Sequence, residues 1–470
     1  MSNYDRLSAL DNSFLLFEKP NAYTHVASTQ IFDAAPLRLE DGGIDFDAIR
    51  KAHAAILHRI PRYRQVLEWV PLIDQPVWVD DPHFDLDFHL RHTSLPHPGT
   101  ERQLKRLSAR IMQQHVDRAK PLWETWVVEG LEGERFALIS KVHHCMIDGI
   151  SGVDIMQLLM SPTEDAELPT PEPFVPRPAP SGMELLRDEV ARRLSLPIEA
   201  VRDFQKFAEE ATDLRREVQT RLRAAANLVG STLSSASETP INGPIGPHRR
   251  FDWHRTPISE IKQVRRALGG SLNDVVLTIV TGAFRRYLEK RGVVLDGIEF
   301  RVMTPVSVRR ETEHGQLGNR VSSWIFQLPL EVSDPREQLE EISRTTTELK
   351  ESKEAIGAEV LMQAAEWTPP TLLSLGARNI TRTTPFNTVV TNVPGPQQPM
   401  YLLGARLLEV YPHVPLVDNL GLGIALMSYD GQMHWGVNAD RDRVPDLHDF
   451  VVDLEAAFDE LRVLAGQGPG

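Results

Sequence analysis

A proline-rich stretch about one third of the way along the chain is the feature that most limits its possible folds. The segment "SPTEDAELPTPEPFVPRPAPSG" (161–182) combines prolines with acidic residues, and this composition favours an extended linker without a core of its own. Residues 183–228 then show a charged, amphipathic helical pattern that is interrupted at Pro197. A second loop at 234–247 closes this connector. The chain is therefore divided into two parts, and each must build its own hydrophobic core.

Both parts mix strand and helix patterns. In the N-terminal part, 25–34 and 136–143 alternate or stay apolar with β-branched residues, and this predicts strands. Apolar residues at helical spacing predict helices over 46–59 and 101–118. The N-terminal part is therefore expected to combine a sheet with helices.

The C-terminal part continues this mixture. Residues 271–290 have the pattern of a helix, and Ser271 or Asn273 is suited to cap its start. Residues 422–440 predict a hairpin that turns at Asp430–Gly431. Further patterns predict strands over 300–309 and 320–330, a strand that runs into a Pro/Gly turn over 388–399, and a helix over 333–352.

The predicted fold class is α/β, with two lobes that each combine a mixed sheet with helices. We expect an N-terminal lobe over 1–160, a linker and helical connector over 161–247, and a C-terminal lobe over 248–470. A chain of 470 residues is long enough for each lobe to bury a core. Ligands often bind where two lobes face each other, so we expect the functional site between them.

Composition and charge restrict the class of partner. Hydrophobic residues make up 41% of the chain and charged residues 25%, as in ordinary globular proteins. The net charge of −14 argues against a general nucleic-acid or anionic-lipid binder. An anionic ligand would need a local basic patch, and the candidate is formed by Arg249, Arg250 and Arg255, although such clusters are more often solvated. We therefore expect no nucleic-acid partner.

Three further features favour a cytoplasmic protein. The longest apolar run, 275–284, is much shorter than the ~18–20 residues that span a membrane. The N-terminus lacks a basic region followed by an apolar one, so no secretory signal is predicted. The single cysteine, Cys145, cannot form an internal disulfide and fits a reducing compartment.

The stretch "KVHHCMIDGISG" (141–152) holds the most reactive combination of residue types. A zinc site needs three or four ligands that converge on one point, whereas adjacent His143 and His144 point in different directions on a strand or a helix. We therefore expect no metal. Cys145 also diverges from its neighbours, and a free cysteine is more often buried than reactive. A histidine base at the end of the predicted strand remains, beside a purely structural role, which the residues alone leave open.

The motif "HHCMIDG" (143–149) resembles the HHxxxDG signature of the CoA-dependent acyltransferases, which include chloramphenicol acetyltransferase and peptide-synthetase condensation domains. Nearly the whole chain is similar to one branch, the bacterial wax ester synthase/diacylglycerol acyltransferases. The blocks that carry this resemblance are "LSALDNSFLLFE" (7–18), "PLWETWVVEGL" (121–131), "TPINGPIGPHRRF" (239–251), "SLNDVVL" (271–277), "GNRVSS" (318–323), "NVPGP" (392–396) and "GVNADRDRVPDL" (436–447).

The resemblance implies two chloramphenicol-acetyltransferase-like lobes with a tunnel between them and a helical connector. It implies an O-acyltransferase that moves a long-chain acyl group from acyl-CoA to a fatty alcohol or diacylglycerol, giving wax ester or triacylglycerol. His144 is then the general base and His143 a supporting residue. Asp148 has a structural, orienting role and Gly149 forms the turn of the motif. No cofactor is implied, because acyl-CoA is a substrate.

Four further residues match family blocks and are expected near the substrates. Asn273 is a candidate oxyanion donor, and its alternative role is to cap the helix that follows. Trp123 belongs to the "PLW" trio, for which wall and packing roles are favoured over chemistry. Pro394 and Gly395 either shape the tunnel or end a strand.

Two other functions stay open at this point. The acyl donor could be bound to a carrier protein, as in condensation domains with the same signature. The chain could also be a non-catalytic lipid-binding homologue, although His144, Asp148 and Gly149 argue against this. Because the implied substrates dissolve in membranes, we also expect peripheral association with a membrane or lipid droplet.

Overall fold

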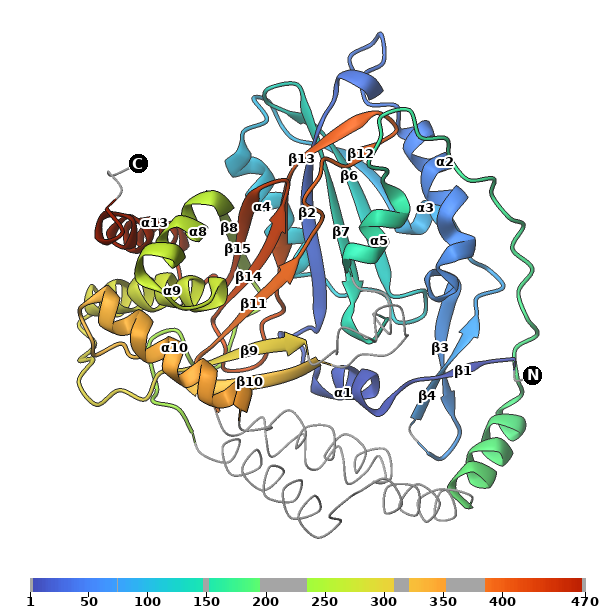
Figure 1. Ribbon diagram of the computed structural model, residues 1–470. Coiled ribbons are helices and arrows are strands. Elements are labelled where there is room, and N and C mark those ends of the chain that lie inside the picture. The colour runs from blue at the N-terminus through green and yellow to red at the C-terminus, as the bar shows by residue number, and fades with distance from the viewer. Residues whose placement is uncertain are drawn as a thin grey trace, which may run out of the picture.

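The computed structural model describes residues 3–73, 75–146, 152–194, 235–307, 321–351 and 385–466. These residues form two six-stranded sheets and one three-stranded sheet. The two large sheets lie side by side at the centre of the molecule, and helices cover their outer sides (Figure 1). The two-lobed α/β architecture expected from the sequence is confirmed.

The N-terminal lobe is built on the sheet with strand order β12-β13-β2-β7-β6-β5. Its strands are β2 (His25–Asp33), β5 (Leu90–Ser94), β6 (Trp123–Leu131), β7 (Arg135–His143), β12 (Tyr401–Leu402) and β13 (Ala405–His413). Its α-helices are α1 (Ala9–Phe17), α2 (Phe46–Ile56), α3 (Leu86–His89), α4 (Glu101–Met112) and α5 (Gly152–Leu159). Short 3-10 turns are η1 (Ala35–Leu37), η2 (Leu57–Arg59), η3 (Pro61–Arg64) and η4 (His144–Met146). The small sheet contains β1 (Asp5–Arg6), β4 (Gln75–Asp80) and β3 (Gln65–Val70), in that order.

The C-terminal lobe is built on the sheet with order β10-β9-β11-β14-β15-β8. Its strands are β8 (Arg249–Pro257), β9 (Arg301–Ser307), β10 (Val321–Gln327), β11 (Thr388–Pro394), β14 (Leu422–Tyr429) and β15 (Gln432–Asp440). Its helices are α8 (Ile258–Leu268), α9 (Leu272–Glu289), α10 (Pro335–Glu351) and α13 (Leu447–Leu464). Helix α9 is buried along most of its length and forms the main hydrophobic core of this lobe with the sheet and with α13.

Several local predictions are confirmed by these elements. Strands β2 and β7 match the predicted strands, and α9 begins after Ser271, whose side chain caps the helix together with Asp274. The predicted hairpin turn has positive φ angles at Asp430 (42°) and Gly431 (76°), which is the conformation a tight two-residue hairpin turn requires. These signals are local in sequence, and this is why they could be predicted.

Helix α4 ends at Met112, earlier than the predicted end at 118. The buried Lys141 side chain stabilises this end, because its Nζ donates hydrogen bonds to the carbonyl oxygens of Ile111 (2.8 Å) and Gln114 (2.9 Å). An ammonium group at the C-terminal end of a helix also complements the helix dipole.

The connector is described in part. The proline-rich segment forms no helix or strand from 162 to 181, as predicted, and residues 182–194 are helical. The remainder of the predicted amphipathic region, 195–228, lies outside the described residues. Among the described helices no single one is long and apolar enough to cross a membrane; only α8 and α9 together pass that test, and they are bent by 96°.

Strands β12 and β13 cross from one half of the chain to the other. Both strands follow residue 248, in the C-terminal half of the chain, yet β13 pairs antiparallel with β2 in the N-terminal sheet. Strand β13 also contacts β14 and β15 of the C-terminal sheet. The C-terminal half therefore completes the N-terminal sheet. The sequence patterns give no indication of this exchange, because it depends on a long-range pairing.

We predict that the junction of the two sheets is intolerant of added bulk at Gly436 in β15. A Cβ there would lie 1.8 Å from the carbonyl oxygen of Pro412 in β13. Gly436→Ala should lower the free energy of unfolding, measured by chemical denaturation, by about 3 kcal/mol or more. Gly431→Ala is the matched control: its turn is open, and the cost comes only from its φ of 76°, about 1–2 kcal/mol. Equal losses for both variants would contradict this account.

Candidate active site

The HHxxxDG motif begins where a central strand ends. His143 is the last residue of β7, opposite His25 of β2, and His144 opens the 3-10 turn η4. The backbone N–H of His143 donates to the carbonyl oxygen of Leu122 (2.9 Å), so the "PLW" block fixes the end of the strand. The backbone of both histidines is thus held in place, and the turn points their two side chains in different directions.

His144 is partly exposed and is held by two contacts with the N-terminal segment. Its imidazole stacks on Phe14, with ring centroids 3.9 Å apart and an interplanar angle of 19°. Its backbone N–H donates to the carbonyl oxygen of Thr24 (2.8 Å). Burial lowers the pKa of His144 to about 4, because the charged imidazolium would lose its hydration. The side chain is therefore neutral near pH 7 and able to accept a proton.

His143 is fully buried, and hydrogen bonds fix its tautomer. Its Nε2 lies 3.1 Å from Glu18 Oε1, and its Nδ1 accepts the backbone N–H of Cys145 at 3.2 Å. Since Nδ1 accepts, Nε2 carries the proton and donates to the carboxylate. The supporting role of His143 stays a prediction.

Glu18 follows helix α1 and connects several parts of the site. Its Oε1 accepts the backbone N–H of Thr24 (3.0 Å), and its Oε2 pairs with Arg118 (2.6 Å). Burial alone would raise the pKa of Glu18, but the hydrogen bonds from His143 and Arg118 together hold it well below its usual range. Glu18 is therefore an ionised carboxylate in the folded protein.

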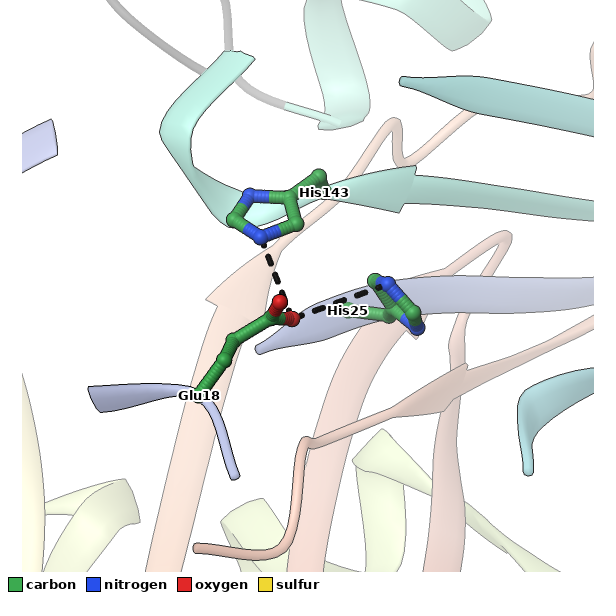
Figure 2. Close-up of side chains that lie close together, drawn as sticks. All are labelled: Glu18, His25 and His143. Atoms are coloured by element: carbon green, nitrogen blue, oxygen red, sulfur yellow. Dashed lines mark ion pairs between the residues drawn. The ribbon is translucent and has the colours of Figure 1, made fainter. Parts of the chain in front are cut away.

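His25 completes a cluster with Glu18 and His143, shown in Figure 2. Its side chain is buried, and neither ring nitrogen has a hydrogen-bond partner among the described residues; Nε2 lies 3.8 Å from Glu18 Oε1. It borders a cavity of about 10 Å³ that Arg249 and Asn438 also line, which has room for roughly one water molecule. Burial, followed by the charge of Lys141, keeps the pKa of His25 well below its usual value.

The three ligand atoms of this cluster lie within 4.8 Å of one another, close enough to surround a cation. However, both nitrogens of His143 and both oxygens of Glu18 already have partners. The positive charges of Lys141 and Arg118 lie close to the cluster and would repel a bound cation. These contacts favour a hydrogen-bonded cluster over a metal site. The expectation that the protein needs no metal stays a prediction.

Cys145 is fully buried in the N-terminal core beside the motif. Burial raises the pKa of its thiol well above the ordinary value, so the thiolate is not formed near neutral pH. The side chain of Cys145 therefore packs in the core, and its backbone N–H donates a hydrogen bond to Nδ1 of His143. Asp148 and Gly149 lie in 147–151, outside the described residues, and their predicted roles stay predictions.

The block around Asn273 meets the "NVPGP" block. Asn273 is exposed, and its Oδ1 accepts a hydrogen bond from Asn392 Nδ2 (2.8 Å). The alternative role as helix cap is wrong, because Ser271 caps α9. The neighbouring Asp274 is buried and accepts from Thr346 Oγ1 (2.8 Å). Two blocks far apart in sequence thus form one surface.

The other candidate residues have clear packing environments. Trp123 is 3% exposed, stacks between Tyr63 and His89, and donates from Nε1 to the carbonyl oxygen of Tyr63 (2.9 Å). Gly395 follows the exposed Pro394 and donates its N–H to the carbonyl oxygen of Ser428 (3.0 Å), while a Cβ there would lie 2.4 Å from that oxygen. The close approach explains the glycine at this strand end.

The suspected basic patch is mostly neutralised. Arg249 is buried and pairs with Asp440 (3.4 Å), and Arg255 pairs with Glu409 (2.9 Å). An anion-binding surface made of these arginines is therefore not supported.

Comparison with solved structures defines the class of fold. A wax ester synthase/diacylglycerol acyltransferase from Marinobacter aquaeolei VT8 is similar over 98% of this chain and 100% of its own, with a TM-score of 0.67 and 26% identity. The starter condensation domain of rhizomide synthetase, solved with C8-CoA and Leu-SNAC, is similar over 100% and 96%, with a TM-score of 0.57 and 14% identity. The fold is that of the two-lobed acyltransferases.

Sequence comparison identifies the family within this class. The model of the wax ester synthase/diacylglycerol acyltransferase catalytic domain matches residues 7–276, and that of the WS/DGAT C-terminal domain matches 317–462. A putative diacylglycerol O-acyltransferase of Mycobacterium tuberculosis is 31% identical over 97% of this chain and 90% of its own length. The probable diacylglycerol O-acyltransferase tgs1 of the same species is 30% identical over 97% and 96%. The chain belongs to the wax ester synthase/diacylglycerol acyltransferase family, and it is an acyltransferase that acts on hydroxyl acceptors.

Sequence reasoning missed the residues that surround the motif histidines: Phe14, Glu18, Thr24 and His25. Phe14 and Glu18 lie inside the block at 7–18, which indicated the family but no role for either residue. Their proximity to the motif follows from the pairing of β2 with β7, and no local pattern reports that pairing.

Proposed function

We propose that the chain transfers a long-chain acyl group from acyl-CoA to a fatty alcohol or diacylglycerol, with His144 as general base. The observation that carries this proposal is the neutral, partly exposed imidazole of His144 at the end of β7, oriented by Phe14 and Thr24. A base must be unprotonated and fixed in direction to accept a proton from a hydroxyl, and His144 meets both requirements.

The proposed reaction needs no acyl-enzyme. His144 takes the proton of the acceptor hydroxyl while its oxygen attacks the thioester carbonyl, so a C–O bond forms and the carbonyl electrons move to the oxygen. The tetrahedral oxyanion collapses, the C–S bond breaks, and the imidazolium returns its proton to the CoA thiolate. Because burial lowers the pKa of His144 to about 4 and a thiol has a pKa near ~8.5, this return is strongly downhill.

The oxyanion needs hydrogen-bond donors, and one such donor is commonly worth ~2.7–4 kcal/mol. Asn273 supports this role, since Asn392 occupies its Oδ1 and the Nδ2 amide is the end that can donate. Trp123, Pro394 and Gly395 contribute shape to the substrate region. A long acyl chain gains about 0.8 kcal/mol for each buried CH₂, which favours an apolar path between the lobes.

A CoA-release assay tests the proposed base, His144, and the proposed acyl donor, acyl-CoA, together. With acyl-CoA supplied without any carrier protein, and fatty alcohols or diacylglycerol as acceptors, the wild type should release CoA. His144→Gln should lower kcat by about 10²–10⁴-fold, because the proton acceptor is lost. Cys145→Ala, one residue away, is the matched control and should retain most activity. Full turnover by folded His144→Gln would refute the base, and CoA release only with a carrier-bound donor would favour the alternative enzyme.

Association with a membrane or lipid body is part of the proposal. Leu72, at the tip of the β3–β4 hairpin, is 94% exposed, and the adjacent helix over 182–194 exposes Met183 (74%) and Leu194 (73%). Met183, Val190 and Leu194 share one helical face, while Leu185 faces the core. Large apolar side chains that share a surface are suited to contact lipid.

We predict that this surface holds the protein on lipid. The double variant Leu72→Ser/Met183→Ser should reduce the fraction that co-sediments with phosphatidylcholine vesicles at least several-fold, because two of the most exposed apolar side chains are removed. Val294→Ser is the matched control, since Val294 is also exposed (77%) but lies in the other lobe. Unchanged sedimentation of the double variant would exclude this surface as the contact.

A further inference from the structure

We propose that Glu18 is a positioning residue that holds the base His144 in place through His143 and Thr24. The inference rests on the proposed function and adds a residue to which the family motifs give no role. Glu18 itself does not touch the imidazole of His144. Its carboxylate instead binds the side chain of His143 and the backbone N–H of Thr24, the two residues that accept the backbone N–H groups of Cys145 and His144.

The first connection runs through His143. Glu18 Oε1 accepts the Nε2–H of His143 at 3.1 Å, and Figure 2 shows the two side chains pointing toward each other. Nδ1 is then free to accept the N–H of Cys145 at 3.2 Å. That N–H belongs to the peptide that directly follows His144. If His143 adopted the other tautomer, two donors would face each other and the turn η4 would lose this bond.

The second connection runs through Thr24. The same oxygen of Glu18 accepts the backbone N–H of Thr24 at 3.0 Å, and the carbonyl oxygen of Thr24 accepts the N–H of His144 at 2.8 Å. Thr24 Oγ1 donates to the carbonyl oxygen of Phe14 (3.0 Å), whose ring stacks on the imidazole of His144. The contacts that orient His144 therefore converge on one carboxylate.

The surroundings of Glu18 favour this role because they keep it ionised and fixed. Arg118 holds Oε2 at 2.6 Å, and the side chain of Glu18 is almost completely buried. A buried carboxylate that accepts several hydrogen bonds is a strong acceptor with one preferred position. The other titratable groups around it are His25, His143 and Lys141, and His115 lies farther toward the surface.

A bound cation is the competing explanation for this cluster. A cation would need the Nε2 lone pair of His143, so it would displace the Nε2 proton that now forms the hydrogen bond to Glu18. It would also lie near the positive charges of Lys141 and Arg118. The positioning role predicts that dialysis of the full-length protein against EDTA leaves kcat unchanged and that added Zn²⁺ does not raise it. Loss of activity with EDTA and recovery with Zn²⁺ would overturn the positioning role in favour of a metal site.

The decisive test compares Glu18→Ala, Glu18→Gln and Glu18→Ala/His143→Ala in the CoA-release assay. We expect Glu18→Ala to lower kcat by about 10–100-fold with KM changed less than about two-fold, because orientation is lost and substrate contacts are kept. Glu18→Gln should lose less, since its amide oxygen can still accept from His143. The double variant should be no worse than Glu18→Ala, because both substitutions break one connected path.

The controls separate this inference from the proposed function. Glu409→Gln alters another buried carboxylate, bound by Arg255 and Tyr411 on β13, and should leave kcat unchanged. If His144→Gln is inactive but folded Glu18→Ala matches the wild type, only the role of Glu18 is refuted. If the wild type releases no CoA with any acceptor, the proposed function itself fails. Should Glu18→Ala not fold, Glu18→Gln with a wild-type kcat would still refute the proposal.

Discussion

The antiparallel pairing of β2 with β7 is the constraint on which the active site depends. The two strands pair over nine residues each, from Asp33 opposite Arg135 to His25 opposite His143. This register brings the residues before β2 against the residues after β7. Helix α1, Glu18 and Thr24 consequently surround the motif histidines, although more than a hundred residues separate them along the chain. A slip of one residue would turn His143 to the opposite face of the sheet.

Burial and basicity oppose each other at this site. The N-terminal core surrounds His143 and Cys145 completely and shields much of His144, which lowers the pKa of His144 to about 4. A lower pKa makes the imidazole a weaker base, but it guarantees the neutral form and favours return of the proton to the leaving thiolate. In the proposed mechanism, the fold thus keeps His144 neutral near pH 7 at the expense of its strength as a base. In the proposed positioning role, the hydrogen bonds that Glu18 accepts from His143 and Thr24 compensate by fixing the direction of the His144 imidazole.

Much of the fold and part of the site could be predicted because the signals are local. The alternation in β2 and β7, the cap at Ser271 and the turn at Asp430–Gly431 each depend on a few neighbouring residues. The HHxxxDG motif is local in the same way, while the roles of its histidines stay predictions. The exchange of β13 into the N-terminal sheet, the early end of α4 at Lys141, and the roles of Glu18 and Thr24 depend on long-range contacts. No local pattern encodes these contacts. Of the two predicted caps of α9, Ser271 and Asn273, Ser271 is the one that caps the helix.

The protonation state of His144 is the most direct test of this account. The protein labelled with ¹⁵N-histidine can be titrated from pH 7 to pH 4 by NMR, with the His144 signal assigned from its absence in His144→Gln. Because the folded pKa lies below the ordinary value of about 6.5, His144 should stay neutral at pH 5.5 and protonate only as the pH approaches about 4. Protonation of His144 with a midpoint near pH 6.5 would show that the imidazole is freely hydrated, and it would contradict a base that the fold shields from water and holds in one direction.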